Sequence, residues 1–266
     1  MTQPELTPGG LGLAALLILF NAAISIRLRL GLEKMLFLSA LRCVLQLLLL
    51  GIVLRWVFEA ESPWIICGIM LGMACLAGYE AARRTGYRLK RMLPMTLVVM
   101  LVASLSITLF ATQGVLGVSP WYEARYLIPI LGMILGNALN GISLGLTTVL
   151  RGFRERRAEV ELHLAHGATP REASRDVMRD AIRTGMIPIL NSMVAAGVIS
   201  IPGMMTGQIL GGEEPKTAAY YQIFILFCIA GSVALGTTGV VYASLRLVFD
   251  DRWRLRIERI VKLEER

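Results

Sequence analysis

Hydrophobic residues in this chain occur in long, nearly unbroken stretches rather than at the spacing of surface helices or half-buried strands. A helix needs about 20 such residues to cross roughly 30 Å of hydrocarbon, and the stretches are long enough for that. Each span must be helical, because lipid offers no hydrogen-bond partner to free backbone groups. The pattern predicts an all-α, polytopic membrane protein with about seven transmembrane helices, at residues 8–26, 35–58, 64–82, 92–113, 126–150, 186–210 and 219–248.

The composition points to the same class of protein. The chain has 266 residues, of which 55% are hydrophobic and 17% are charged, and its mean hydropathy is +0.63. A soluble domain of this length carries about a quarter of charged residues. We therefore expect residues 1–266 to form a single transmembrane domain of a multi-pass protein in the cell (inner) membrane.

Basic residues are distributed unevenly among the predicted loops. Of the 27 Lys and Arg residues, 23 fall in the loops after the first, third and fifth spans and in the C-terminal tail. Loops rich in Lys and Arg stay in the cytosol, so the N-terminus is predicted to lie outside and the C-terminus in the cytosol. The net charge of +8 thus arises from the cytosolic loops and reflects the orientation of the chain in the membrane. We expect membrane lipids around the chain and no nucleic-acid partner.

One segment, residues 151–185, is polar and charged although it lies between two predicted spans. Gly167 suits the position just past a helix, and Thr169, Pro170 and Glu172 are typical of a helix start closed by a capping box. Two short helices that meet at a turn are therefore expected on the cytosolic face. That shape favours the docking of a separate partner that drives the membrane subunit.

Catalytic and ion-coupling groups are missing from the predicted spans. All 19 Asp and Glu residues lie in loops, tails or span ends, whereas proton- and sodium-coupled carriers usually need a carboxylate within the membrane. The sequence also lacks HExxH and the phosphate-binding loop of nucleotide hydrolases. We expect a non-enzymatic subunit that binds no cofactor itself and does not hydrolyse ATP.

Polar side chains within the spans are candidates for lining a substrate pathway, because they are costly in lipid. Arg42 and Gln46 lie on one face of the second predicted span, and the alternative for them is an interfacial anchor with an interhelical hydrogen bond. Asn137 and Asn140 share one side of the fifth predicted span. Hydrogen bonding between helices is the alternative for this second pair.

The fifth predicted span also carries two pairs of glycines four positions apart. They are Gly132 with Gly136 and Gly141 with Gly145. Small residues at this spacing let a neighbouring helix approach closely. We therefore expect the fifth span to be a central, packed helix.

The sixth predicted span contains a helix-breaking pair, Pro202 and Gly203. Broken helices at membrane depth are tolerated where they are buried in protein or line a cavity, and transporters use them for binding. Thioethers favour soft metals, so Met204 and Met205 are candidate metal ligands, with plain packing as the alternative. Further pathway candidates in this span are Asn191, Thr206 and Gln208.

Four stretches of the sequence carry a family resemblance. They are IPILGMILGN at 128–137, Glu161 with Gly167-Ala168-Thr169, IPGMMTGQILGG at 201–212, and Ala40-Leu41-Arg42 with Gln46. Together they resemble the FetB-type iron-export ABC permeases, a family that also includes the plant aluminium-sensitivity permeases. The resemblance covers residues 28–245, and the stretch at 201–212 is long and unusual.

The resemblance implies the membrane permease subunit of an ABC transporter, and for bacterial members it implies iron export and resistance to oxidative stress. A separate ATPase subunit would hydrolyse ATP, and two copies of each subunit are the usual plan, so a homodimer is expected. Importer permeases insert a Glu…Gly loop into the ATPase, and Glu161 and Gly167 keep its six-residue separation. Coupling is thus expected at these two residues with Ala168 and Thr169. The alternatives are another metal, a small organic solute such as a nucleotide sugar, or an ATPase-independent channel.

Overall fold

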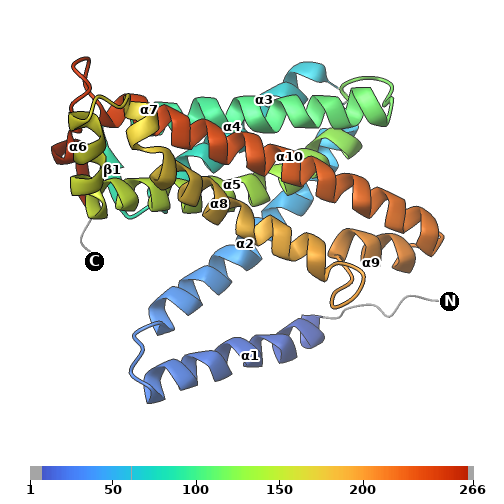
Figure 1. The fold of residues 1–266 in the computed structure, drawn as a ribbon. Coiled ribbons are helices and arrows are strands. Elements are labelled where there is room, and N and C mark those ends of the chain that lie inside the picture. Colours follow the sequence, from blue (N-terminus) through green and yellow to red (C-terminus); the bar gives the residue numbers. More distant parts are fainter. Residues whose placement is uncertain (1–7, 61, 263–266) are drawn as a thin grey trace. The chain divides into compact units, whose positions relative to one another are not determined.

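The structure, a computed structural model, describes residues 8–60 and 62–262 of the chain (Figure 1). The chain forms two compact units, Met1–Glu61 and Ser62–Arg266, and each is described by itself. The predicted outward position of the N-terminus falls on residues outside the described part of the chain. The expectation of one domain over residues 1–266 stays a prediction.

The N-terminal unit is a hairpin of two apolar helices, α1 (Pro8–Arg27) and α2 (Glu33–Ala60). The Ser25 side chain stabilises the turn between them. Its hydroxyl group donates to Glu33 Oε2 at 2.9 Å and accepts from the Leu32 amide at 3.0 Å. The polar groups of the turn thereby find partners within the unit.

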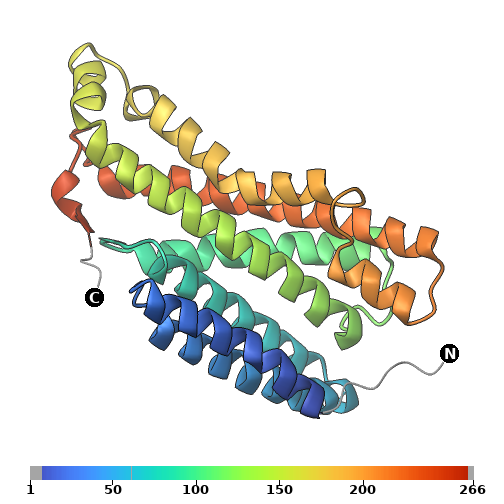
Figure 2. The ribbon, with the colours of Figure 1, turned by 90° about the horizontal axis from the view of Figure 1, so that it is seen from below.

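The C-terminal unit is a helical bundle. Its long helices, within the described residues, are α3 (Pro63–Arg83), α4 (Met92–Leu109) with the π-helical turn η1 (Phe110–Val115), α5 (Ala124–Glu155), α8 (Arg175–Ala195) and α10 (Pro215–Val248). Helix α5 packs against α3, α4, α8 and α10, and Figure 2 shows it running through the bundle. The prediction that the fifth span is a central helix is confirmed.

Close packing of α5, α8 and α10 depends on glycine. Thr237 of α10 is fully buried and lies beside Gly141 and Gly145 of α5 and Gly185 of α8, a cluster called here the glycine notch. A Cβ atom added at Gly145 or Gly185 would come within 2.6 or 2.5 Å of the Thr237 Cγ2 methyl group. The second predicted glycine pair therefore makes the close approach, whereas a Cβ at Gly136 would meet nothing within 4 Å.

Six helices of the described residues are long and apolar enough to cross a membrane, namely α1, α2, α3, α4 with η1, α5 and α10. The prediction of a multi-pass, all-α membrane protein is confirmed, but residues 186–210 do not form one continuous span. Helix α8 ends at Ala195, and α9 (Gly203–Leu210) begins after a loop at residues 196–202. Gly197 has φ of 81°, and the β-branched residues after it favour extended backbone, so the helix stops before Pro202 is reached.

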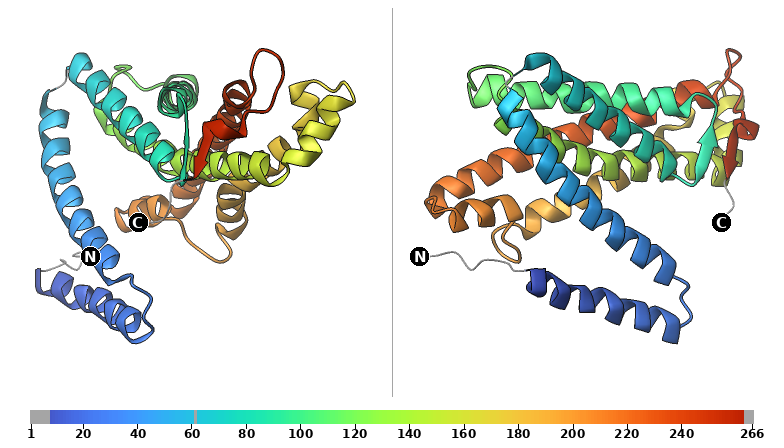
Figure 3. Two further views of the ribbon diagram at one scale, coloured as in Figure 1. Left: turned by 90° about the vertical axis from the view of Figure 1, so that its left-hand side faces the viewer. Right: turned by 180° about the vertical axis from the view of Figure 1, so that it is seen from behind.

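One end of the C-terminal unit, called here the basic end, carries residues 84–91, 156–175 and 249–262. Its short elements are α6 (Arg157–Ala165), α7 (Pro170–Ala173), the 3-10 turn η2 (Ile257–Arg259) and strands β1 (Tyr87–Leu89) and β2 (Ile260–Lys262). The two strands pair antiparallel and lie side by side in the right-hand view of Figure 3. The opposite end, which holds residues 116–123 and 211–214, is called the far end.

Candidate functional site

A pocket of about 530 Å³ lies at the far end, between the first turns of α5, helix α9 and the first turns of α10. Met204 and Gln208, four residues apart on α9, both line it. Met133 of α5 and Glu213 also line it. The far-end pocket therefore brings together two thioethers, an amide and a carboxylate.

These side chains offer ligand atoms of different softness. Thioether sulfur suits soft ions such as Cu(I), while carboxylate oxygen suits harder ions. Met204 also packs against the apolar core around Ile130, Ile134 and Ile225, so it has a packing role as well. Among the described residues, no group of three or more His, Cys, Asp or Glu side chains is placed to hold a metal ion. A metal in this pocket would therefore need sulfur or amide ligands besides Glu213.

Two buried amide oxygens at this end have no hydrogen-bond partner among the described residues. They are Gln208 Oε1 on α9 and Gln222 Oε1 on α10. A buried acceptor without a partner costs on the order of 1–3 kcal/mol, and a bound water, ion or ligand is the usual explanation. A donor or a cation in the far-end pocket would satisfy the oxygen of Gln208.

Several other predicted pathway residues lie outside the far-end pocket. The side chains of Thr206 and Asn137 donate to backbone carbonyl groups four residues earlier in their own helices, at 3.2 and 2.9 Å. Met205 follows Met204 on α9, so it points about 100° away around the helix. Asn191 is exposed on α8. The structure thus gathers Met204 and Gln208 but not these four residues.

The remaining predicted pathway residues lie elsewhere. Asn140 is near the basic end, where its Oδ1 accepts a hydrogen bond from Arg84 Nη1 at 3.3 Å. Arg84 also pairs with Glu80 at 3.3 Å, so it links α3 to α5. Arg42 and Gln46 lie one turn apart on α2 and are exposed within the N-terminal unit. A pathway role for each stays a prediction.

At the basic end, the predicted capping box is confirmed at the start of α7. Thr169 Oγ1 accepts from the Glu172 amide at 3.3 Å, and Glu172 Oε2 accepts from the Thr169 amide at 2.8 Å. The backbone amide and the hydroxyl group of Thr169 lower the pKa of Glu172 below its usual range. Gly167 has φ of 88°, and the Ala168 amide donates to the His163 carbonyl at 3.1 Å. Residues 166–169, called here the coupling turn, are thus well defined.

Arg156 ties the helix before the coupling turn to the helix after it. It donates to Glu159 of α6 at 2.8 Å and to Asp180 of α8 at 3.1 Å. The hydrogen bonds between Arg156 and Glu159 lower the pKa of Glu159 and raise that of Arg156. Glu161, a predicted coupling residue, pairs with Arg157 at 2.8 Å on α6. The start of α6, which precedes the turn, is therefore tied to the N-terminal part of α8.

A groove of about 550 Å³ lies at the basic end beside the coupling turn. Glu161, Gly167 and Ala168 line one wall, and Trp253 and Leu255 of the tail line the other. The structure thus brings three predicted coupling residues into one groove. The tail wall was not predicted, because its partners are distant in the sequence.

Asp250 shapes this tail. Its carboxylate accepts from the amides of Arg254 and Arg252 at 2.8 and 3.0 Å, and from the guanidinium groups of Arg254 and Arg256 at 2.8 and 2.9 Å. These bonds, the Arg254 amide foremost, lower the pKa of Asp250 to about 2. Arg154 at the end of α5 donates to a carbonyl group of β2 at 3.1 Å. One Asp followed by alternating Arg residues is the sequence signal that could have indicated this fold.

Known proteins resemble this chain over most of its length. A family model described as "Uncharacterised protein family (UPF0014)" matches residues 8–249. The chain belongs to the UPF0014 family. A UPF0014 membrane protein of Synechocystis sp. is 36% identical over 81% of this chain and 83% of the relative. The match to the family spans both units of the structure.

Two further relatives of this chain have descriptive names. The "Probable iron export permease protein FetB" of Escherichia coli is 29% identical over 98% of this chain and 100% of the relative. "Protein ALUMINUM SENSITIVE 3" of Arabidopsis thaliana is 32% identical over 91% of this chain and 88% of the relative. No solved structure matches the chain. The family resemblance and the multi-pass membrane location predicted from the sequence are confirmed.

Proposed function

We propose that this UPF0014 protein is the membrane permease subunit of an ABC transporter, driven by a separate ATPase subunit and exporting metal ions, iron foremost. The observation that carries the proposal is the groove in which Glu161, Gly167 and Ala168 lie opposite the tail. A groove flanked by a capped helix start suits the insertion of a structural element from a partner. The name of the Escherichia coli relative supports iron export.

Helix α8 supplies a physical connection between the two sites. It is continuous from Arg175, which α7 separates from the coupling turn, to Ala195, where the loop before α9 begins. A helix of 21 residues is about 31 Å long. ATP-driven movement of the coupling turn would tilt α8 as a lever and shift α9 at the wall of the far-end pocket.

The far-end pocket is the proposed metal-binding place along the pathway. Met133, Met204, Gln208 and Glu213 supply its ligand atoms, and Gln208 Oε1 lacks a partner within the described residues. Loss of the metal to the outside would follow when α9 moves away from α5 and α10. Two copies of the permease would surround the complete pathway, since one bundle offers few walls.

The coupling proposal is tested by Gly167→Arg in the permease copurified with its cognate ATPase. Gly167 has a positive φ, and its Cβ position is open, so Arg strains the turn and fills the groove without a clash in the core. We expect normal membrane insertion and loss of transport in vesicles. Glu155→Gln, at the end of α5 and away from the groove lining, is the control. Unaltered transport by Gly167→Arg would contradict the proposal.

The substrate is tested by ATPase activity of the reconstituted complex with Fe²⁺, Cu⁺, Zn²⁺ and UDP-sugars added in turn. Stimulation by Fe²⁺ is expected, and its loss in Met204→Leu would place the metal at the far-end pocket. Stimulation by Cu⁺ alone would support metal export but would replace iron with copper as the substrate. Stimulation by a UDP-sugar alone would replace metal export with transport of an organic solute.

A further inference from the structure

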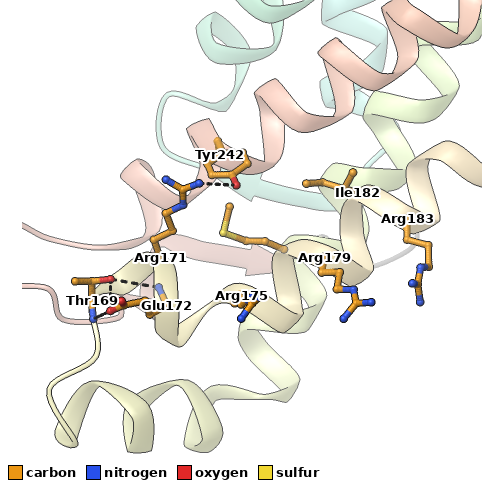
Figure 4. Close-up of a pocket in the computed structure, with 9 residues that line it drawn as sticks. Thr169, Arg171, Glu172, Arg175, Arg179, Ile182, Arg183 and Tyr242 are labelled. Atoms are coloured by element: carbon orange, nitrogen blue, oxygen red, sulfur yellow. Dashed lines mark hydrogen bonds between the residues drawn. The ribbon is translucent and has the colours of Figure 1, made fainter.

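A row of arginines follows one face of α8 at the basic end. Arg175, Arg179 and Arg183 are spaced four residues apart, so they project from the same side of the helix. Together with Arg171 and Tyr242 they line an open pocket of about 750 Å³, the arginine pocket (Figure 4). Arg171 Nη2 donates to the Tyr242 hydroxyl group at 3.3 Å, and its guanidinium carbon lies 5.2 Å from the ring centre.

Carboxylates are segregated from this row. Asp180 forms an ion pair with Arg156 at 3.1 Å, and the negative charge of Asp176 also raises the pKa of Arg156. Both carboxylates therefore interact with the residue that begins α6, and neither lines the arginine pocket. Glu172 does line the pocket, but its Oε2 accepts hydrogen bonds from the amide and hydroxyl group of Thr169 at 2.8 and 2.7 Å. Within the described part of the chain, Arg175, Arg179 and Arg183 form no ion pair.

The net charge of the pocket lining follows from these residues. Four arginines and one glutamate give the lining a net charge of +3. The apolar residues of the lining are Ile182, which is half-buried, and Met178, which is buried. A ligand with an anionic group and an attached apolar part matches this combination.

The same face of α8 changes character one turn after Arg183. Ile187, Leu190 and Val194 continue it, and they are 45%, 48% and 78% exposed. Exposed aliphatic side chains belong in hydrocarbon, whereas exposed arginines belong in water or among headgroups. This change along one face of α8 matches a boundary between headgroups and acyl chains at the level of Arg183. Tyr242, an aromatic residue with a polar tip, suits that boundary.

We propose that the arginine pocket binds the phosphate of an anionic phospholipid from the leaflet at the basic end. Guanidinium groups bind phosphate oxygens in a bidentate manner, and basic pockets beside membrane helices hold anionic headgroups. The lipid would sit against the N-terminal half of α8, the same helix that joins the coupling turn to α9. Anionic lipid would thereby be a structural ligand of the permease, whatever substrate it carries.

The test uses the whole protein in nanodiscs of phosphatidylcholine with a rising fraction of phosphatidylglycerol, followed by mild detergent extraction and native mass spectrometry of retained lipid. We expect selective retention of phosphatidylglycerol by the wild type. The variant R175Q/R179Q/R183Q should retain at least tenfold less, since each basic residue near the surface contributes about 1 kcal/mol, or several-fold, to binding and the three factors multiply. The matched control R83Q/R88Q/K90Q removes the same charge from exposed positions at the basic end and should retain phosphatidylglycerol like the wild type.

Three results would overturn the proposal. The first is equal retention by the two triple variants, and the second is equal retention of phosphatidylcholine and phosphatidylglycerol by the wild type. The third is displacement of the lipid by millimolar inorganic phosphate, which would make a soluble phosphate the ligand. If R175Q/R179Q/R183Q keeps its lipid but no longer copurifies with the ATPase, the row is a protein-docking surface instead.

Discussion

Helices α5 and α9 both border the far-end pocket, yet their surroundings differ sharply. Half of the 32 residues of α5 are buried, whereas none of the eight residues of α9 is. Helix α5 is fixed by neighbours on several sides, including the glycine notch. Helix α9 lies between two loops and packs mainly against α10. A rigid wall therefore faces a weakly held one, and weakly held segments are those that move during function.

The largest expected effect comes from a substitution in the glycine notch, which packs the rigid helix α5 against its neighbours. In Gly185→Ala, the new Cβ would lie 2.5 Å from Thr237 Cγ2 and 2.7 Å from the Gly141 carbonyl oxygen, which is backbone and cannot rotate away. We expect the free energy of unfolding to fall by about 1–3 kcal/mol. Thermal unfolding in detergent measures the change, with Gly136→Ala as control because its Cβ meets nothing within 4 Å. Equal stability of the two variants would mean that the notch is not tightly packed.

The next prediction probes the pocket between the two helices. In Gln208→Leu, an amide oxygen without a partner is replaced by an apolar group of similar size. Stability should be unchanged or slightly higher, because a buried acceptor no longer lacks a partner. Metal-stimulated ATPase activity of the reconstituted complex should fall about tenfold if the oxygen is a ligand, which corresponds to roughly 1.4 kcal/mol. Full activity with raised stability would assign Gln208 no ligand role.

A third prediction concerns the tail, which is held by charge rather than by apolar packing. In Asp250→Asn, the arginines at 252, 254 and 256 lose their shared carboxylate, so hydrogen exchange of residues 249–262 should become faster. The pKa of Asp250 in the folded chain, about 2, lies below its ordinary value of 3.8. Its stabilising contribution is thus complete above about pH 4 and is lost as the pH falls through about 2. Asp251→Asn is the control, and equal exchange in both variants would contradict this role.

The smallest effect is expected from a substitution in α9, the weakly held helix at the far-end pocket. In Gly207→Ala on α9, the new Cβ would meet nothing within 4 Å. Alanine favours the helical state by roughly 0.5–1 kcal/mol over glycine, so α9 should become slightly more stable. If movement of α9 gates the pocket, transport should slow while the melting temperature stays almost constant. A large loss of stability would show that α9 is packed more tightly than its exposure indicates.

Local signals account for most of what the sequence predicted correctly. The Thr169–Glu172 capping box and the glycine pair at 141 and 145 are read from residues a few positions apart, and both are in the structure. Hydropathy likewise located the spanning helices. It merged α8 and α9 into one span, because the loop between them is as apolar as a helix.

Contacts between distant residues could not be predicted in the same way. The pairing of Tyr87 with Lys262 joins positions far apart in the chain, and short strands leave no periodic pattern to reveal it. Met133 and Glu213 join Met204 in one pocket only because α5 and the loop before α10 meet in space. The hydrogen bond from Arg84 to Asn140 likewise joins residues far apart in the chain, and the shared pathway role of Asn137 and Asn140 stays a prediction.

The glycine notch has a consequence for how such proteins change over generations. A Cβ at residue 145 is obstructed closely by one atom, the Thr237 methyl carbon at 2.6 Å, while its next neighbours lie at 3.5 Å or more. Removing that methyl group with Thr237→Ser would make room for Gly145→Ala. The side chains at positions 145 and 237 therefore compete for the same space. A larger side chain at one position is tolerated when the side chain at the other becomes smaller. Homologous chains with alanine at the first position are expected to carry serine or a smaller residue at the second.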